Sequence, residues 1–259
     1  MNVKDKVIVV TGGASGIGEA MCRRFAAEGA KGVVVSDYNG EGAVRVADEI
    51  GGLAVQADVG REEDIKKLVD MTIKKYGPID LFCSNAGISA TGGAEAPDAL
   101  WQRCWDVHVM SHVFAARAVL PSMIERGGGY LLPTGSAGGL LTTLGAAPYA
   151  ISKHAAVAFA EWLSITHAHQ GIKVSCLCPL GVKSGMLSEE TEGVGTLLMQ
   201  TAVTPEVAAD CVIKGLEKEE FLILTHPEVA DFFRHKAGNY ERWLRHMRRE
   251  QAEYVLGEK

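Results

Sequence analysis

Residues 11–18 read TGGASGIG, and their neighbours in the chain show what this stretch does. The apolar run at residues 7–10 precedes it as a buried strand would, and apolar residues at helical spacing follow it from Ile17 onward. A glycine-rich turn between a strand and a helix lets the backbone approach an anion closely. The free N–H groups and the positive dipole end of the helix then stabilise the charge of a pyrophosphate. The stretch therefore predicts a dinucleotide site at this turn.

Short apolar runs alternate with helical spacing along the whole chain. The strands we expect span residues 7–10, 32–36, 53–56, 81–84, 130–132, 174–177 and 221–224. Between them lie patterns such as Ile65, Leu68, Val69, Thr72 and Ile73, whose steps of three and four place one apolar stripe on a helix. Strand–helix alternation predicts a parallel sheet with helices on both faces. We therefore expect an α/β fold, a Rossmann-like doubly wound sheet of about seven strands.

Length and composition favour one domain over residues 1–259. The chain has 259 residues, 47% of them apolar and 22% charged, with a formal net charge of −6. A chain of this size buries enough surface to fold without disulfides or metals. It has no run of 18 apolar residues, and its first residues lack the apolar core of a secretory signal. We expect a cytoplasmic protein whose partners are neither membranes nor, given the acidic balance, nucleic acids.

The cysteine spacing is not typical of a disulfide-bonded or metal-binding protein. They stand at Cys22, Cys83, Cys104, Cys176, Cys178 and Cys211 and form no CxxC pair. We expect buried free thiols, with neither a disulfide scaffold nor a zinc site.

An acidic residue ends the second expected strand. Asp37 stands nineteen positions after Gly18, close to the spacing of a carboxylate that accepts hydrogen bonds from the adenosine ribose. A carboxylate there would repel a 2′-phosphate, and Ala14, Ser15 and Tyr38 bring no basic residue to compensate. The pattern favours NAD over NADP. The alternative is that Asp37 merely caps a turn.

Tyr149 and Lys153 stand four residues apart in a segment of helical pattern that runs to Trp162. This spacing places both side chains on one helix face, about 6 Å apart along the axis. An ammonium group beside a phenol favours the phenolate and lowers the pKa of the tyrosine. The pair predicts proton chemistry, with an exposed pair on an amphipathic helix as the alternative.

The motifs together resemble those of the short-chain dehydrogenase/reductase family along essentially the whole chain. TGGASGIG at 11–18 matches the family's TGxxxGxG, SNAG at 84–87 its NNAG, and YAISK at 149–153 its YxxxK, in the same order and spacing. The resemblance implies an oxidoreductase that transfers a hydride between NAD(H) and a secondary alcohol or ketone.

The resemblance also implies roles for individual residues. Ser136 orients the reacting oxygen, Tyr149 exchanges its proton, and Lys153 holds the nicotinamide ribose and lowers the pKa of Tyr149. The cofactor-binding residues implied are Gly12, Ser15, Gly16, Ile17, Gly18, Asp37, Asp58, Val59, Asn85, Ala86, Gly87, Tyr149, Lys153, Pro179, Gly181, Val182 and Ser184. Leu180 departs from the family's usual form, because it separates Pro179 from Gly181.

A second departure lies in the proton relay. His108 stands where the family usually has an asparagine that holds a relay water. A histidine can donate or accept a hydrogen bond and titrates near neutrality, so it can carry the relay as a catalytic residue. The alternative is that His108 fills space while the relay is impaired. His112 follows four positions later, but no third ligand accompanies the pair, and we expect no metal.

The substrate pocket implied by the resemblance is apolar. It draws on a variable substrate loop at 185–203 and on residues 127–152, which carry no charge and predict a partly dehydrated cleft wall. The residues it would use are Leu140, Leu141, Leu144, Met186, Leu187, Leu197, Leu198 and Met199. No Arg or Lys between Ser136 and Tyr149 could bind an anionic group. We expect a hydrophobic secondary alcohol or ketone.

The remaining expectations concern partners and rival functions. Relatives commonly pair the helices that carry His108 and Tyr149, so we expect a homodimer or homotetramer with Trp101, Trp105 or Trp162 at the contact. Residues 226–259 form a C-terminal helical extension, expected as one helix over 226–256 with an apolar side; these apolar residues are Phe232, Phe233, Tyr240, Trp243 and Leu244. The rival functions are an NADPH-dependent carbonyl reductase and a non-catalytic NAD-binding regulatory protein. A hydrolase around Ser136 is disfavoured because GxSxG is absent.

Overall fold

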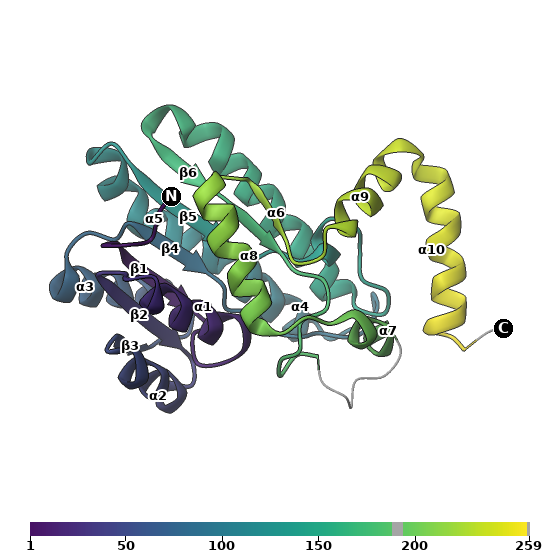
Figure 1. Cartoon of the computed structure of the whole chain (residues 1–259). Coiled ribbons are helices and arrows are strands. Elements are labelled where there is room, and N and C mark those ends of the chain that lie inside the picture. Colours follow the sequence, from purple (N-terminus) through teal and green to yellow (C-terminus); the bar gives the residue numbers. More distant parts are fainter. Residues whose placement is uncertain (188–193, 258–259) are drawn as a thin grey trace.

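The computed structural model describes residues 1–187 and 194–257, and within them the chain forms a parallel sheet covered by helices (Figure 1). Six strands lie in the order β3-β2-β1-β4-β5-β6. Their bounds are Val7–Thr11 (β1), Gly32–Asp37 (β2), Leu53–Gln56 (β3), Leu81–Ser84 (β4), Gly129–Pro133 (β5) and Ile172–Val174 (β6). The expected α/β Rossmann-like fold is confirmed.

A second, two-stranded parallel sheet continues the first one. It pairs β7 (Cys176–Cys178) with β8 (Leu222–Leu224). The chain changes its strand partner at Ser175, whose N–H donates to Leu131 O at 3.1 Å, whereas the N–H of Cys176 donates to Phe221 O at 2.6 Å. The Ser175 hydroxyl is held by Tyr130 Oη at 2.6 Å. The single strand expected at 174–177 is therefore two short strands.

Helices cover the sheet and bury apolar residues on both of its faces. Their bounds are Gly16–Ala27 (α1), Gly40–Ile50 (α2), Glu62–Tyr76 (α3), Asp98–Trp105 (α4), Ser111–Glu125 (α5), Ala147–His167 (α6), Val194–Thr201 (α7) and Pro205–Lys218 (α8), with short helical turns at Asp106–Met110 (η1), Ala137–Gly139 (η2) and Ala168–Gln170 (η3). Along β1, Val7 and Val9 belong to one apolar cluster and Ile8 and Val10 to the other. This alternation follows the two-residue period of a strand, and burial on both faces explains the continuous apolar run.

The helix α4–η1–α5 runs without interruption over Asp98–Glu125, and its α5 part packs against β4 and β5. By length and composition it is apolar enough to span a membrane, although half of its most apolar window is buried inside the fold. The sequence analysis, which searched for unbroken apolar runs, missed this segment. Its central turn η1 is a π-helix, a widened turn that is frequent at functional sites. His108 lies in this turn and is fully buried.

The C-terminal extension forms two helices, α9 (Glu228–Gly238) and α10 (Tyr240–Tyr254), which we call the C-terminal arm. The helices break at Asn239, whose side chain accepts a hydrogen bond from Arg242 N and so begins α10. The single helix expected over 226–256 is therefore wrong. Of the residues expected on its apolar side, Phe232, Phe233 and Tyr240 are exposed whereas Trp243 is buried. The arm extends beyond the α/β body (Figure 1).

Candidate active site

The expected site residues gather at the carboxyl ends of the parallel strands, where ligands of open α/β sheets bind. The glycine-rich turn follows β1, Asp37 ends β2, Asp58 and Val59 follow β3, Asn85 follows β4, Ser136 follows β5, and Pro179 follows β7. Tyr149 and Lys153 reach the same edge from the first turns of α6. The topology therefore brings together segments that are far apart in the sequence.

The glycine-rich turn has the shape of an anion cradle. Gly12 and Gly16 adopt positive φ angles of 67° and 53°, which residues with a side chain rarely adopt. A Cβ on Gly18 would lie 1.9 Å from the carbonyl oxygen of Gly12, so a side chain there cannot fit. Ser15 and Ile17 flank Gly16 at the beginning of α1. The open backbone at this helix N-terminus fits the pyrophosphate of a dinucleotide.

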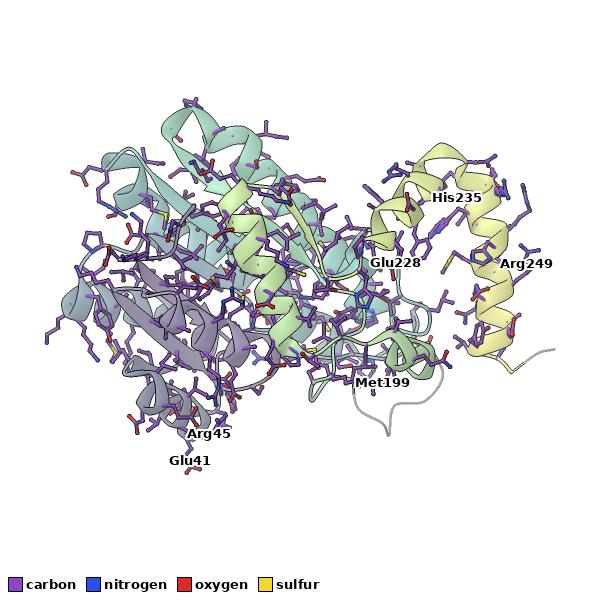
Figure 2. All side chains as sticks on the ribbon, viewed as in Figure 1. Glu41, Arg45, Met199, Glu228, His235 and Arg249 are labelled. Carbon is purple, nitrogen blue, oxygen red and sulfur yellow. The ribbon has the colours of Figure 1, made fainter. Side chains whose placement is uncertain are left out.

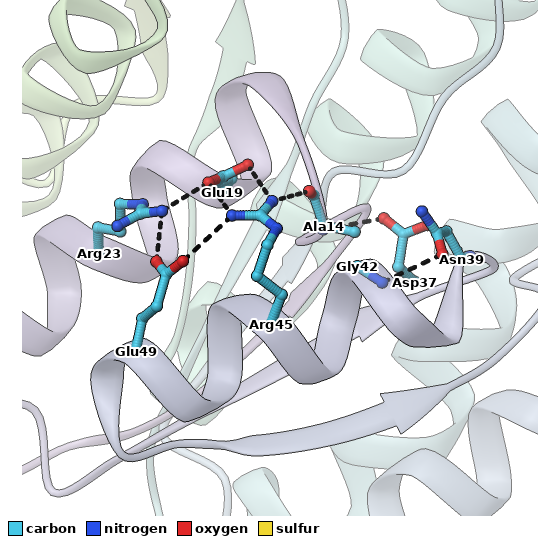
Figure 3. A network of polar contacts seen from close by, with 8 residues as sticks. All are labelled: Ala14, Glu19, Arg23, Asp37, Asn39, Gly42, Arg45 and Glu49. Atoms are coloured by element: carbon cyan, nitrogen blue, oxygen red, sulfur yellow. Dashed lines mark hydrogen bonds and ion pairs between the residues drawn. The ribbon is translucent and has the colours of Figure 1, made fainter.

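Asp37 is held next to this turn. One of its carboxylate oxygens accepts a hydrogen bond from Ala14 N at 3.0 Å, and the other accepts from Asn39 N at 2.9 Å. Asn39 in turn caps α2 by accepting from Gly42 N (Figure 3). Both sides of the carboxylate are thus fixed while the residue stays partly exposed.

Arg45 is a basic residue at this place that the sequence analysis missed. Its guanidinium donates to both carboxylate oxygens of Glu19 at 2.9 Å and to the Ala14 carbonyl oxygen at 3.0 Å. Arg23 and Glu49 extend the network along α1 and α2 (Figure 3). The hydrogen bonds from Arg45 lower the pKa of Glu19 despite partial burial. The guanidinium of Arg45, which contacts the glycine-rich turn, is therefore already paired with carboxylates.

The segment after β3 is fixed by an ion pair with α4. Both carboxylate oxygens of Asp58 accept from Arg103, at 3.1 and 3.0 Å, and one also accepts from Gly60 N at 3.0 Å. Burial acts to raise the pKa of Asp58, but these hydrogen bonds prevail and lower it. Val59 packs into the core. The roles of Asp58 and Val59 at an adenine ring stay predictions.

Asn85 joins three strands at the centre of the site. Its amide Nδ2 donates to Thr11 O at 3.0 Å, and its Oδ1 accepts from Thr134 Oγ1 at 3.1 Å. The hydroxyl of Thr11 accepts the N–H groups of Asn85 and Ala86, at 2.9 and 3.1 Å. Gly87 faces the reaction site, because a Cβ there would lie 3.6 Å from Lys153 Nζ. One amide therefore fixes the glycine-rich turn relative to β5.

Ser136, Tyr149 and Lys153 form one cluster, in which Ser136 and Lys153 are buried and Tyr149 is partly exposed. Lys153 Nζ donates to Thr134 O at 2.9 Å and lies 5.9 Å from the centroid of the Tyr149 ring. Ser136 Oγ accepts from Gly138 N at 3.0 Å, which fixes its rotamer, and the Ser136 hydroxyl is near enough to the phenol of Tyr149 to affect its pKa. The three residues that the YxxxK motif and its upstream serine predict thus meet in space.

Burial dominates the protonation of this cluster. It lowers the pKa of Lys153 to about 8 and raises the pKa of Tyr149, while the nearby Ser136 hydroxyl acts in the lowering direction. We expect from the sequence that Lys153 lowers the pKa of Tyr149, but in the structure desolvation of the phenol raises that pKa. Desolvation disfavours the charged form of both groups.

His108 has both ring nitrogens engaged. Nε2 accepts from Ile88 N at 3.0 Å, so the ring proton is on Nδ1 and is donated to Ser152 Oγ at 2.8 Å. The ring meets Tyr149 edge-on, with centroids 5.5 Å apart. Burial and the nearby Lys153 charge lower the pKa of His108 to about 2. His108 is therefore a neutral hydrogen-bonding group, and any relay through it would not involve titration near neutrality.

The segment after β7 accommodates the extra Leu180. Its N–H donates to Thr225 Oγ1 at 3.2 Å, and the preceding Pro179 O accepts from Ala137 N at 2.8 Å. Gly181 pairs with Val203 through a 3.1 Å backbone hydrogen bond, and Val182 is buried beside it. Ser184 lies opposite the glycine-rich turn, because a Cβ on Gly16 would lie 3.3 Å from Ser184 Cβ. The segment thus lies next to the glycine-rich turn even though Leu180 separates Pro179 from Gly181.

The expected pocket residues divide between core and cleft. Leu140 is buried in the core and Leu141 packs against it, whereas Met186 is exposed and its Cε would lie 3.5 Å from a Cβ on Gly87. Residues 188–193 and the side chain of Leu197 lie outside the described part of the chain. The structure thus places Met186 near the reaction site and assigns Leu140 mainly to packing.

The residues that sequence reasoning missed are those that act through long-range side-chain contacts. They are Thr11, Arg45, Arg103, Thr134, Ser152 and Thr225. Ser152 alone carried a local signal, as a polar residue between Tyr149 and Lys153 on a mostly apolar helix.

Comparison with known proteins identifies the family. The model of the short chain dehydrogenase family matches residues 6–195. The chain belongs to the short-chain dehydrogenase family. It is thus an alcohol-type oxidoreductase with a Rossmann fold that binds a nicotinamide dinucleotide.

Two curated relatives show the level of similarity. The 1-deoxy-11-beta-hydroxypentalenate dehydrogenase of Streptomyces exfoliatus is 35% identical over 239 residues, which cover 88% of this chain and 86% of that protein. Human epidermal retinol dehydrogenase 2 is 31% identical over 233 residues, which cover 86% and 74% respectively.

Solved structures resemble this chain over most of its length. The 3-ketoacyl-(acyl-carrier-protein) reductase of Brucella melitensis, complexed with NADH, matches with a TM-score of 0.78 at 28% identity, covering 86% of this chain and 96% of that one. A short-chain dehydrogenase/reductase of Burkholderia phymatum, in complex with NAD, has a TM-score of 0.84 at 24% identity and covers 93% and 96%. The second likeness supports the fold.

The buried histidines predict how stability depends on pH. His108 and His112 have pKa values lowered to about 2 and about 3, below the usual 6.5, so between these values the unfolded chain binds protons that the native chain does not. The free energy of unfolding therefore falls as pH drops below about 6.5, by up to about 1.4 kcal/mol per pH unit for each histidine. Replacement of His108 by Asn should remove one of these contributions in urea unfolding between pH 7 and pH 5.

Substitutions of His108 can distinguish a role in hydrogen bonding from a role in ionisation. An asparagine can accept from Ile88 N and donate to Ser152 Oγ, whereas His108→Ala leaves Ile88 N without this acceptor and Ser152 Oγ without this donor. Turnover should stay near the wild-type value in His108→Asn and fall well below it in His108→Ala. Equal turnover in all three proteins would show that His108 has no part in catalysis, and an unchanged acid slope in His108→Asn would show that it does not stay neutral.

Proposed function

We propose that the chain is an NAD-dependent short-chain alcohol dehydrogenase or ketoreductase acting on a hydrophobic secondary alcohol or ketone. The observation that supports this most directly is the cluster of Ser136, Tyr149 and Lys153 beside the glycine-rich turn. The cluster combines a hydroxyl donor, a phenol and a cation at the edge of the sheet where a dinucleotide binds.

Each side chain of the cluster has a distinct task. Ser136, with its rotamer fixed by Gly138 N, hydrogen-bonds the reacting oxygen, and Tyr149 Oη takes the alcohol proton or returns it to a carbonyl. Lys153 uses one N–H on Thr134 O and has two further N–H groups for ribose hydroxyls. Bound NAD would supply the hydride acceptor and a positive charge that favours the tyrosinate. Ser136 and Tyr149 would both hydrogen-bond the reacting oxygen of the substrate, and this fixed orientation raises the reaction rate.

The environment of Asp37 supports NAD as the preferred cofactor. Its carboxylate lies beside the turn that would hold the pyrophosphate, where it can accept ribose hydroxyls and repel a 2′-phosphate. Arg45 would otherwise attract such a phosphate, but its guanidinium is paired with Glu19 and Glu49. The local charge balance thus disfavours the additional phosphate.

The walls of the site support an apolar substrate. Residues 127–152 carry no charge, Leu141 packs against the apolar core, and Met186 lies beside the cluster as an apolar group. The dehydrogenases named above, of a hydroxypentalenate and of retinol, also take alcohols by name. These features fit a small apolar molecule as the substrate. We propose a cytoplasmic location for the protein.

Replacement of Tyr149 by Phe tests the function. We expect a loss of at least about a hundredfold in kcat, because the proton exchange with the alcohol is removed. The measurement is NADH formation with cyclohexanol, 2-octanol, 1-phenylethanol and a 3-hydroxysteroid. Tyr130→Phe is the matched control, since it removes a buried phenol that pairs with Ser175 away from the site. A Tyr149→Phe rate close to wild type contradicts the proposal, and NAD binding without turnover of any of these alcohols favours a regulatory protein.

Replacement of Asp37 by Asn tests the cofactor preference. Wild type should prefer NAD over NADP in kcat/KM, and Asp37→Asn should shift the ratio toward NADP by about tenfold or more, because a repulsive charge is removed. Asp48→Asn, which removes an exposed charge from the following helix α2, should leave the ratio unchanged. A wild-type preference for NADPH would instead favour the carbonyl reductase.

We also propose that the chain forms a homodimer or homotetramer through α4 and α6. These helices pack together and expose Trp105, Ile151, Trp162 and Ile165, the last with 80% of its surface accessible. Such an apolar face is typical of an interface. Light scattering after size exclusion should show Trp162→Glu shifted toward the monomer, whereas Val44→Glu on α2 should match wild type. An unshifted mass for Trp162→Glu would exclude this face.

A further inference from the structure

A lysine of the C-terminal arm reaches back to the segment that connects Ser136 to Tyr149. Lys236 stands on α9 and its Nζ donates to Leu140 O at 2.6 Å and to Leu141 O at 3.0 Å. These carbonyls follow the short helical turn η2, whose end has no further intrahelical donors. A cation at the carbonyl end of a helical turn is favourable both as a hydrogen-bond donor and electrostatically.

The third proton of the ammonium group faces the catalytic helix. Lys236 Nζ lies 3.5 Å from His154 Nε2, and His154 Nδ1 lies 2.8 Å from Ala150 O. Because a carbonyl only accepts, Nδ1 carries the ring proton and Nε2 is free to accept from the lysine. His154 is adjacent in sequence to Lys153 on α6. Lys236 therefore connects three elements: the arm, the loop at residues 140–146 and α6.

The second helix of the arm covers this contact. The ring of Trp243, with 9% of its surface exposed, lies 4.9 Å from Lys236 Nζ, at cation–π distance. At the other end of α10, a Cβ on Gly145 would lie 3.7 Å from Val255 Cγ1. One end of α10 thus contacts the Lys236 ammonium group, and the other end approaches the loop at residues 140–146. Figure 2 shows the arm, marked by Glu228, His235 and Arg249, at the opposite end of the molecule from α2, marked by Glu41 and Arg45.

The loop itself is coupled directly to the reacting groups. It begins after η2, where a Cβ on Gly139 would lie 2.5 Å from the carbonyl oxygen of Lys153, so η2 and α6 touch backbone to backbone. It ends at Ala146, where Gly92 N donates to Gly145 O and Ala147 N to Gly92 O, both at 2.8 Å. Tyr149 follows two residues after Ala147. A shift of this loop would therefore move the wall of the pocket next to Ser136 and Tyr149.

We propose that Lys236 is a positioning residue that clamps the loop at residues 140–146 to the catalytic helix, so that the C-terminal arm determines the outer wall of the substrate pocket. The substrate side of this inference rests on the proposed function. The arm lies outside residues 6–195, the part that the family model matches, so the clamp is a feature of this chain beyond that match. The class of substrate it would select is the apolar alcohol or ketone that contacts Leu141 and its neighbours.

Amide hydrogen exchange tests the clamp independently of any activity. Lys236→Met keeps the apolar stem of the side chain but removes all three donors. Exchange in residues 140–146 should become at least about tenfold faster, because local opening then breaks fewer contacts. Arg234→Met on the same helix is the matched control, since Arg234 pairs only with exposed Asp231 within the described residues and should leave the loop unchanged. Lys236→Arg should restore slow exchange.

Kinetics test the consequence for the substrate. With 2-octanol as the probe, Lys236→Met should raise the KM of the alcohol about tenfold while the KM of NAD and kcat stay within about twofold of wild type. Lys236→Arg should restore the KM of the alcohol. A general loss of structure would instead lower kcat and affect both KM values.

The possible outcomes separate the two proposals. Loop exchange in Lys236→Met equal to that in Arg234→Met overturns the clamp, whatever the enzyme does. Faster exchange with an unchanged KM for 2-octanol overturns the assignment of the pocket wall. If wild type oxidises no alcohol, the proposed function fails and the exchange measurement still decides the clamp. Should Lys236→Met fail to fold, Trp243→Leu removes the ring over the ammonium group, and faster loop exchange there supports the clamp whereas unchanged exchange rejects it.

Discussion

The site depends on one buried ammonium group, that of Lys153, and on the carbonyl oxygen of Thr134 that holds it. A cation in the interior is unfavourable unless polar groups surround it, and burial accordingly lowers the pKa of Lys153 to about 8. The same cation acts on its neighbours, because it contributes to the lowered pKa of both His108 and His112. A single buried charge thus lies among neutral imidazole rings and the thiols of Cys104, Cys176 and Cys178, and the proposed function assigns proton exchange to the phenol of Tyr149 beside it.

Much of this arrangement follows from local sequence. Continuous apolar runs predict strands buried on both faces, and the steric demand for glycine predicts the turn at residues 11–18. The four-residue spacing of Tyr149 and Lys153 predicts one helix face, and the structure places both in the same cluster. These predictions succeed because each depends on residues close together in the chain or on the edge of a parallel sheet, where strand ends must meet.

The features that sequence did not predict depend on distant partners. The strand at 174–177 divides because Ser175 is held by Tyr130, which is 45 residues away, and the next residue pairs with β8. The π-turn that buries His108, the pairing of Arg103 with Asp58 and the reach of Lys236 have the same origin. Asn239 is different, since an asparagine before a polar helix is a local capping signal, but the long helical pattern around it outweighed that signal.

The amide of Asn85 has a consequence for protein engineering. By hydrogen-bonding Thr11 and Thr134 it ties the first, fourth and fifth strands together at the edge where they end. The loops that follow these strands begin at this group of hydrogen-bonded residues. A designer who wishes to graft new walls onto this scaffold can therefore treat the three residues as a fixed frame and exchange the loops around them, while any change to the frame would displace the dinucleotide turn and the lysine's carbonyl partner together.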